Sequence, residues 1–377
     1  MQITTTKANL VSPLSLVFGA ADTKGTVPML GTVLLKATDA GKLSFLCSDT
    51  GVLARALSPC DVKGVGEVAV DARRFNDLVR AVPDDKSPIE IKVSESVMQI
   101  KAGRSRFKLP TLDAKDYPRM IPEQTERVSI TMDAARLASM VDDISLSMAV
   151  ADIRIFMNGA LFRIDEQGLW IVSTDGNRLV VSHEPIEALS AITPREVIVP
   201  RKTVLLAKKL LGSGQVKLTI GASDFQLSLP DGTVLLGKSI AGAFPDWKRV
   251  IPKTSFEFSV KADRLSDSLA MIAAMKVVDK EKKNNEAEKI ELVIAENLLT
   301  IQKGDSARCE VDTVSQSADK AEININITYL ADATAIMRGK VEDIRVGFSN
   351  TTTATTPITL RPSGSDYPVA VVMPMRG

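Results

Sequence analysis

One segment of this sequence has the residue types and spacing of a phosphate-binding loop. Residues Gly232 to Ser239 read GTVLLGKS, which matches the pattern G-x-x-x-x-G-K-S/T, in which backbone amides and a lysine bind nucleotide phosphates. That chemistry needs a glycine-rich loop followed by a helix whose N-terminus faces the anion. Here β-branched and bulky residues fill the loop, and Phe244–Pro245 interrupts any following helix. We therefore interpret the segment as a strand after an Asp231–Gly232 hairpin turn; a P-loop NTPase acting on nucleic acid is the alternative from the enzyme class.

Other groups that could do chemistry are sparse. His183 is the only histidine, which removes most zinc sites and His-based catalytic centres, and its place at an expected strand end favours a surface residue. Cys47, Cys60 and Cys309 are odd in number and lack metal-ligand spacing, as expected of buried thiols in a reducing cytosol. The sequence thus predicts no catalytic residue, no metal site, no cofactor and no enzyme.

Composition narrows the class further. A chain of 377 residues with 45% hydrophobic and 25% charged residues is expected to fold into two or three domains. The net charge of +1 and the 4% aromatic content argue against a protein that grips DNA by charge alone or stacks single-stranded bases. The opening residues MQITTTKANL lack an export signal, and no long apolar run follows, so we expect a cytoplasmic protein without membrane contact.

The elements that would position any site repeat three times. TTTKANLVSPLSLV, TMDAARLASMVDDISL and SVKADRLSDSLAMIAAM each run from strand-like residues into a helical pattern, and each is followed by a second strand-to-helix unit. The aromatic–proline pairs Tyr117–Pro118, Phe244–Pro245 and Tyr367–Pro368 recur near the segment ends. We expect six helices at approximately 7–21, 71–81, 133–148, 200–211, 261–280 and 328–340.

The residues between these helices alternate between apolar and polar, with Gly, Asn and Asp at the turns, which predicts antiparallel strands and an α+β class. Proline-rich stretches place boundaries near residues 126 and 254. The expected domains are therefore 1–126, 127–254 and 255–377. The polar stretch 279–289 is interpreted as a solvated loop; the alternative is a DNA or partner contact through Lys280, Lys282 and Lys283.

The expected helices carry more Lys and Arg than Asp and Glu, so a shared helical face would attract phosphate without gripping it. Helices about 10 Å across leave a hole of about 9 Å when six are set side by side and about 28 Å when twelve are, and only the larger hole admits a duplex. Two chains joined head to tail could close such a ring. The candidate DNA-facing cations on these helices are Arg73, Arg74, Arg80, Arg136, Arg201, Lys202, Lys208, Lys209, Lys276 and Arg338.

Several segments resemble the bacterial DNA polymerase III beta subunit family, the beta sliding clamps, and the similarity extends over essentially the whole chain. They are GRSRF (103–107), STDGNRL (173–179), VIVPRKTV (197–204), FPDWKRVIP (244–252) and VVMPMR (371–376). The resemblance implies the DNA clamp fold: three similar domains, antiparallel sheets outside, helices inside, in a ring-forming homodimer. It further implies a non-catalytic processivity factor that encircles duplex DNA without reading sequence. Its implied partners are DNA polymerases, the clamp loader and other proteins that carry a short clamp-binding motif.

The resemblance also implies a partner-peptide pocket between the second and third domains. Met, Val and Pro side chains would make an adaptable apolar surface for a short Leu- and Phe-bearing motif. Its residues would be Met157, Thr174, Gly176, Asn177, Arg178, Leu179, Pro245, Arg249, Val250, Tyr329, Val371, Val372, Met373, Pro374, Met375 and Arg376.

By the same resemblance, Lys24 and Arg154 would touch DNA. The ring interface would pair Phe107 and Leu109 with Ala274 and Met275.

The sequence departs from its relatives at several of these positions. Asn177 stands where some relatives have His, Met157 where they have Leu, and Gly377 where a Leu is common, so partner preference is open. Ala151 lacks a polar side chain expected near the DNA, and the loop 279–289 is longer than typical. Since Ala274 and Met275 are also smaller or softer than usual, a monomeric interaction hub of the same fold is a further alternative to the ring.

Overall fold

The structure is a computed structural model that describes residues 1–83, 87–122, 127–187, 192–275, 288–315, 320–349 and 356–375. Contacts divide the chain into two compact units, which we describe in turn. Unit 1 comprises Met1–Ala138 and Arg195–Ile240, and unit 2 comprises Ser139–Pro194 and Ala241–Gly377. Lys276, Arg376, Gly377 and most of the expected loop 279–289 lie outside the described residues.

Each of the six expected helices forms. They are α1 (Lys7–Val17), α2 (Ala72–Ala81), α3 (Ala134–Ser145), α4 (Arg201–Leu210), α5 (Ala262–Ala274) and α7 (Ile327–Ala335). The first is shorter than expected because the chain tightens into a 3-10 turn over Phe18–Ala20. The last ends five residues early, where the N–H of Met337 bonds to the carbonyl of Thr334, three residues back, and Gly339 follows at φ +73°. Apart from these ends, helical spacing in the sequence located the helices.

Side-chain caps explain where two of these helices begin. The Asp71 carboxylate accepts the N–H of Arg74 at 2.7 Å before α2. The Asn326 side chain accepts the N–H groups of Thr328 and Tyr329 before α7. Such caps satisfy amides that the first helical turn leaves without partners. The cap at Asn326 therefore fixes the start of α7, and with it the position of Tyr329.

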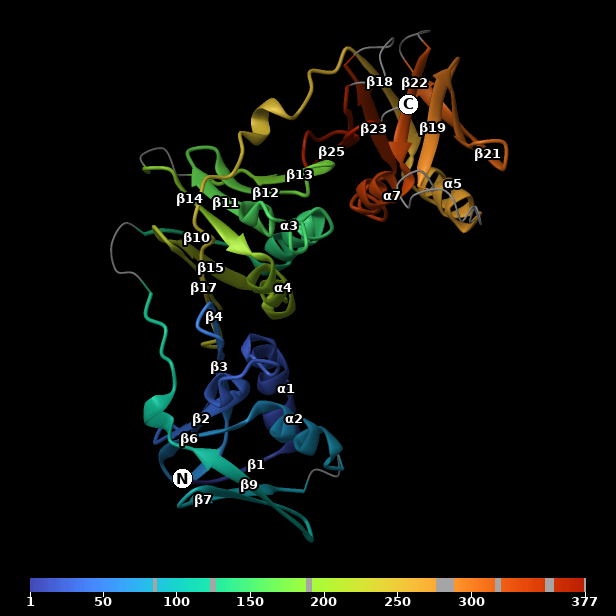
Figure 1. Cartoon of the computed structure of the whole chain (residues 1–377). Coiled ribbons are helices and arrows are strands. Elements are labelled where there is room, and N and C mark those ends of the chain that lie inside the picture. The colour runs from blue at the N-terminus through green and yellow to red at the C-terminus, as the bar shows by residue number, and fades with distance from the viewer. Residues whose placement is uncertain are drawn as a thin grey trace. The chain divides into compact units, whose positions relative to one another are not determined.

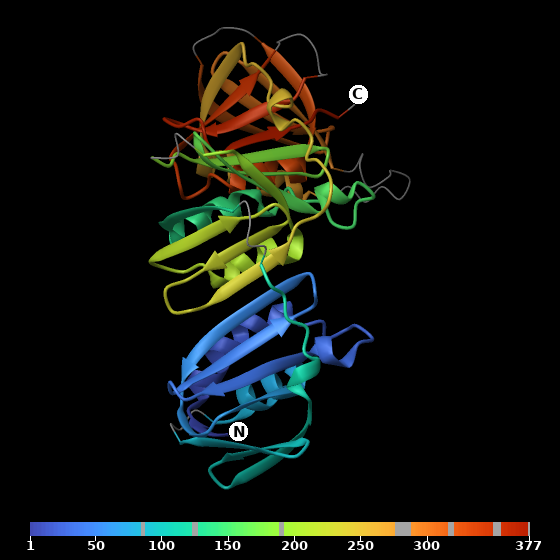
Figure 2. The same cartoon turned by 90° about the vertical axis from the view of Figure 1, so that its left-hand side faces the viewer.

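Unit 1 contains one antiparallel sheet in the order β10-β15-β16-β17-β4-β3-β2-β6-β9-β8-β7-β1-β5. Helices α1, α2 and α4 cover one face of it, with the strands in front of α1 and α2 in the second view (Figures 1 and 2). Buried Phe75 and Val79 of α2 and Leu10 and Leu14 of α1 supply the helical side of the core. The strands are β1 (Gln2–Thr5), β2 (Thr32–Thr38), β3 (Lys42–Ser48), β4 (Val52–Pro59), β5 (Asp61–Gly64), β6 (Gly66–Asp71), β7 (Ile89–Ser94), β8 (Val97–Ala102), β9 (Ser105–Leu112), β10 (Val128–Asp133), β15 (Gln215–Ile220), β16 (Asp224–Ser228) and β17 (Val234–Lys238), and β14 (Arg195–Pro200) leads into α4.

Unit 2 repeats this plan with strands hydrogen-bonded in the order β11-β12-β13-β25-β24-β23-β18-β21-β20-β19-β22. Helices α5 and α7 lie against each other beside this sheet (Figure 1). The strands are β11 (Gly159–Asp165), β12 (Gly168–Thr174), β13 (Arg178–Glu184), β18 (Phe256–Lys261), β19 (Lys289–Ala295), β20 (Leu298–Lys303), β21 (Ala307–Ser315), β22 (Ala321–Asn326), β23 (Asp343–Phe348), β24 (Ile358–Pro362) and β25 (Val369–Val372).

In both units a strand from much later in the chain extends an early hairpin. Strand β17 pairs with β4, with Leu236 opposite Leu53. Strand β25 pairs with β13, with Val371 opposite Leu179. The compact units consequently differ from the expected domains 1–126, 127–254 and 255–377, and the three-domain division stays a prediction.

Two expectations about single residues were wrong in degree. Cys47 is buried, but Cys60, between β4 and β5, and Cys309, in β21, are only half-buried. His183 is half-buried rather than a free surface residue, because its ring stacks on Trp170 with centroids 3.8 Å apart. Within the described residues, no helix is both long and apolar enough to cross a membrane.

Candidate peptide-binding site

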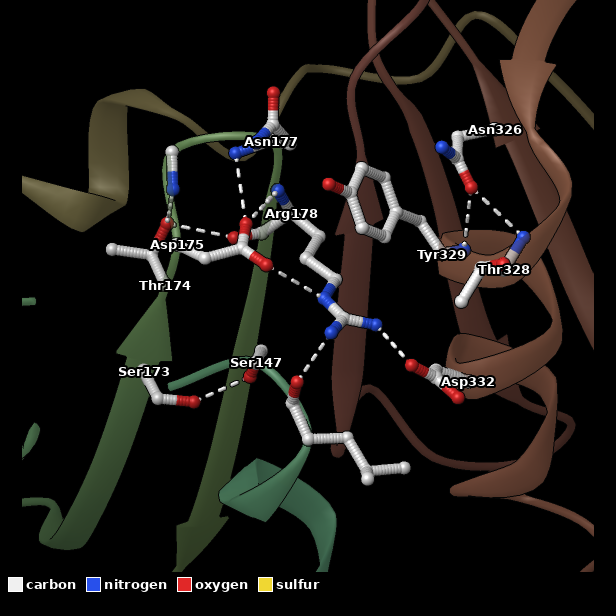
Figure 3. Close-up of polar contacts among 12 residues, drawn as sticks. Ser147, Ser173, Thr174, Asp175, Asn177, Arg178, Asn326, Thr328, Tyr329 and Asp332 are labelled. Carbon is white, nitrogen blue, oxygen red and sulfur yellow. Dashed lines mark hydrogen bonds and ion pairs between the residues drawn. The ribbon is translucent and has the colours of Figure 1, made fainter. Parts of the chain in front are cut away.

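The turn between β12 and β13 is held by its own side chains. The Asp175 carboxylate accepts the N–H groups of Asn177 at 2.9 Å and Arg178 at 3.1 Å. The Thr174 hydroxyl donates to the carbonyl of Arg178 at 2.7 Å and accepts the N–H of Gly176. Gly176 has φ +91°, a conformation that disfavours a side chain. This turn therefore presents the exposed Asn177 from a fixed backbone (Figure 3).

The chain after β25 runs directly beside this turn. The N–H of Met373 donates to the carbonyl of Asn177 at 2.9 Å. Two residues later, the N–H of Met375 donates to the carbonyl of Asn324 at 2.8 Å, and Pro374 bridges Ile325 of β22. These bonds attach residues 373–375 to the β12–β13 turn at one end and to β22 at the other. As a result, the side chains of Met373, Pro374 and Met375 are half-buried and partly open to solvent.

Not every residue implied for the pocket is accessible. Leu179, Val371 and Val372 are at most 2% exposed, so they support the site from beneath. Met157 and Thr174 are 7% exposed. The accessible part comprises Gly176, Asn177, Pro245, Arg249, Val250, Tyr329, Met373, Pro374 and Met375.

Arg178 lies inside the site and links several parts of the chain. Its guanidinium contacts the carboxylates of Asp175 and Asp332 and the carbonyl of Leu146 (Figure 3). The same group lies 4.7 Å from the ring centroid of Tyr329, a cation–π arrangement. Burial is the main cause that raises the pKa of the Tyr329 hydroxyl. Arg178 thus connects β13, the end of α3 and helix α7, and its hydrogen-bonding capacity is largely used within the chain.

Two tryptophans anchor the segment that carries Pro245, Arg249 and Val250. Trp247 is 6% exposed and lies 5.4 Å from the ring of Trp170, on β12. Arg249, in contrast, is almost fully exposed and pairs with Asp246 at 2.9 Å. Sequence reasoning missed this aromatic support. The signal was available, because the chain contains only two tryptophans and large aromatic residues usually mark packing anchors.

A second feature that sequence reasoning missed is an apolar loop beside the turn. Val150, Ile153 and Ile155 are 74%, 96% and 57% exposed. Arg154, between them, pairs with Asp152 at 2.8 Å and reaches the carbonyl of Asp175. The Arg154 side chain, through its hydrogen bond, lowers the pKa of Asp152 to about 2. This loop gives the site an exposed apolar margin.

The candidate DNA-facing cations divide by their contacts. Lys24, Arg73, Arg74, Arg80, Lys208 and Lys209 are exposed, whereas Arg136 and Arg201 are half-buried. Lys202 pairs with Asp49 at 2.6 Å, and Arg338 pairs with Asp263 and Asp267 of α5. Arg154, Lys202 and Arg338 therefore carry charges already balanced by neighbouring carboxylates, which the sequence could not reveal.

The residues expected at a ring interface are exposed or half-buried. Phe107 lies in β9, whose residues Ser105–Pro110 pair with β8 on one side, while β6 pairs only with Thr111 and Leu112. Phe107 is 37% exposed and Leu109 half-buried. At the end of α5, Ala274 is exposed and Met275 is 50% exposed.

The phosphate-loop pattern is not a loop. Residues Val234–Lys238 form strand β17, in which Gly237 lies opposite Val52. The next regular element is the short 3-10 turn Trp247–Arg249, so no helix N-terminus follows Ser239. Among the described residues, no group of three His, Cys, Asp or Glu side chains could hold a metal ion.

Comparisons with known proteins agree with one another. Residues 1–121 match the family "DNA polymerase III beta subunit, N-terminal domain", and residues 131–246 match its central domain. The chain is 30% identical to the beta sliding clamp of Salmonella typhimurium and 29% identical to that of Escherichia coli K12, over the full length of both chains in each case. Its structure is similar to that of the DNA polymerase III subunit beta from Pseudomonas aeruginosa, with a TM-score of 0.87, 28% identity and full coverage of both chains. A sliding clamp from the same organism bound to griselimycin gives a TM-score of 0.89, with 28% identity and full coverage of both chains.

Proposed function

The chain belongs to the DNA polymerase III beta subunit family, the beta sliding clamps, and on that premise we propose how it holds its partners, its DNA and a second copy of itself. It has the sliding clamp fold and is a non-catalytic processivity factor in DNA replication. The matched N-terminal and central family domains, at residues 1–121 and 131–246, support a division of the chain into three domains at 1–126, 127–254 and 255–377.

Polymerases, the clamp loader and other partners dock a short Leu- and Phe-bearing peptide on the surface made by the β12–β13 turn, the Pro245–Val250 segment, Tyr329 and the residues after β25. The observation that carries this proposal is the bond from Met373 to the carbonyl of Asn177, which holds flexible thioethers beside a rigid turn. Methionines adapt to varied apolar side chains. The aromatic ring of Tyr329 offers a packing surface for a peptide phenylalanine.

A labelled peptide tests the site. We expect a fluorescein-labelled peptide containing Leu and Phe to bind the full chain, and Met373→Glu to weaken binding at least tenfold, because a carboxylate would be placed in the apolar contact. Met29→Glu is the matched control, since Met29 is also half-buried but lies in unit 1, outside both peptide sites. Equal binding by both variants, measured by fluorescence anisotropy, would exclude this location.

Two chains form a closed ring, head to tail, through Phe107 and Leu109 of one copy and Ala274 and Met275 of the other. Support comes from their exposure and from the single pairing partner of Ser105–Pro110. Sedimentation at micromolar concentration should give twice the 40.6 kDa of one chain. A persistent 40.6 kDa species would favour the monomeric hub instead.

Enclosure replaces affinity for DNA, which suits a net charge of +1 and cations spread over several helices. The clamp loader places the ring on DNA in the cytoplasm, where it slides without reading bases. After loading onto nicked circular DNA, the protein should remain bound until the circle is cut and then be released. Retention after linearisation would indicate ordinary binding rather than encirclement.

A further inference from the structure

The junction of β4 and β17 in unit 1 has the same backbone plan as the candidate peptide site. There, the N–H of Lys238 donates to the carbonyl of Gly51 at 2.8 Å, just as Met373 donates to Asn177. In both places the donor follows the last residue of the late strand that pairs with the early strand, and the acceptor lies in the turn before that early strand. Unit 1 therefore contains a second copy of the framework on which the peptide site is built.

A cavity of about 540 Å³ opens at this second junction. Its lining residues are Thr50, Pro118, Arg119, Met120, Ile121, Ser223, Asp224, Leu236, Lys238 and Ser239, and we call this cavity the second groove. All of its residues belong to unit 1. Its volume falls within the range of small-ligand pockets.

One wall of the second groove comes from the segment after the first aromatic–proline pair. Tyr117 is 3% exposed, and its hydroxyl donates to the carbonyl of Leu46 at 3.2 Å. This anchor fixes the direction of the following residues. Met120 is half-buried, and Ile121 is 81% exposed. Met120 and Ile121 thus offer an apolar surface to solvent from an anchored backbone. In the same way, Trp247 anchors the segment that carries Pro245 and Val250.

The charges around the second groove select for a carboxylate. Arg119 is held by Glu67 at 3.0 Å, and Asp224 is buried beside Arg127 at 3.3 Å. Lys238 is exposed, and within the described residues its ammonium has no ion pair. An incoming carboxylate could therefore meet an ammonium that no neighbouring carboxylate neutralises.

We propose that the second groove binds an extended peptide segment of a partner protein in which aliphatic side chains flank a carboxylate. The aliphatic groups pack on Met120, Ile121 and Leu236, and the carboxylate pairs with Lys238. This inference goes beyond the proposed function and rests on it only in taking the β13–β25 site as the precedent for peptide docking. A partner with two motifs could then hold one chain at two places, which increases overall affinity through effective concentration.

Methyl NMR spectra of the full chain test the proposal, with labelled Met and Ile methyl groups as reporters. The probe is the peptide acetyl-Leu-Glu-Leu-amide, and acetyl-Leu-Lys-Leu-amide is its charge-reversed counterpart. We expect the first peptide to shift the methyl signals of Met120 and Ile121 with an affinity on the order of 1 mM, as suits so small a ligand. The lysine peptide should bind about tenfold more weakly.

Variants at Lys238 supply the control. Lys238→Glu should weaken binding of the acidic peptide about tenfold, whereas Lys238→Arg, which keeps the charge, should leave it within about twofold. Unchanged affinity for Lys238→Glu would overturn the proposal. So would shifts of Met120 and Ile121 that appear with ATP or inorganic phosphate but not with the peptide, because a nucleotide would then be the occupant.

The two peptide sites fail independently in this experiment. Met373 and Met375 report on the β13–β25 site, so a Leu- and Phe-bearing peptide that leaves them unshifted contradicts the proposed function. An acidic peptide that shifts only Met373 and Met375 contradicts the second groove.

Discussion

The β13–β25 and β4–β17 junctions share a backbone plan and differ in how they treat charge. At β13–β25, Arg178 is 14% exposed and connects two carboxylates, a carbonyl and an aromatic ring. At β4–β17, the turn residue Asp49 pairs with Lys202, which is 42% exposed. Ion pairs shielded from water depend on every partner, whereas solvated pairs contribute little. The two junctions therefore share a backbone hydrogen bond, but only the charge cluster around Arg178 is expected to contribute strongly to stability.

The largest effect on stability should come from the aromatic side chains that anchor two segments, Tyr117 before Pro118–Ile121 and Trp247 within Pro245–Val250. Trp247→Ala removes a buried aromatic side chain and should lower the free energy of unfolding by about 3–5 kcal/mol. Tyr117→Phe keeps the ring and loses only the hydroxyl bonds to Leu46 and Thr32, which should cost about 1 kcal/mol. Urea denaturation followed by circular dichroism measures both. Comparable losses of stability for the two variants would show that burial of the Trp247 ring contributes no more than the hydroxyl bonds of Tyr117.

The charge clusters should respond unequally to the same substitution. Arg178→Met leaves Asp175 and Asp332 without their cation in a shielded place and should cost about 3 kcal/mol. Lys202→Met removes a solvated partner of Asp49 and should cost at most about 1 kcal/mol. Thermal unfolding of the two variants side by side gives the difference. If Lys202→Met proved the more damaging, the proposed contrast between the junctions would be wrong.

A close approach at β17 permits a smaller and more local test. A Cβ atom on Gly237 would lie 2.6 Å from the Cγ2 methyl of Thr203 on α4. Gly237→Ala should therefore destabilise unit 1 by about 1–3 kcal/mol through overpacking. Thr203→Ser removes that methyl group, so the double variant should recover part of the loss. If the double variant is no more stable than Gly237→Ala in the same denaturation assay, the loss of stability does not come from the contact with Thr203.

The smallest effect concerns the loop beside the β12–β13 turn. The Arg154 side chain lowers the pKa of Asp152 to about 2, below the ordinary value near 4. A carboxyl group with a depressed folded-state pKa stabilises the fold above its unfolded pKa and loses that contribution as pH falls through the folded value. Carbon-detected NMR titration should give a midpoint near pH 2 for Asp152. Arg154→Gln should return the midpoint towards its ordinary value, and an unchanged midpoint would exclude Arg154 as the cause.

Periodicity predicted the helices well, because each of them buries one face against a sheet. The GTVLLGKS segment was also interpreted correctly, since Val234–Lys238 form strand β17. The sequence did not reveal the local pair of Arg154 with Asp152. Nor could it show that Lys202 and Arg338 have carboxylate partners, as these contacts join residues from different elements. For the same reason it gave no sign that His183 stacks on Trp170 or that Arg178 ties β13 to α7. Local sequence patterns thus predict helices and strands, whereas contacts between residues distant in sequence decide which side chains remain available for binding.

Strand β4 receives its outer neighbour, β17, only after about half of the chain has followed it in sequence. During synthesis on a ribosome, the edge of Val52–Pro59 would stay without a partner until residues 234–238 emerge, and unpaired edges invite pairing between nascent chains. Translation speed through the intervening region should consequently influence how much of the newly made protein aggregates.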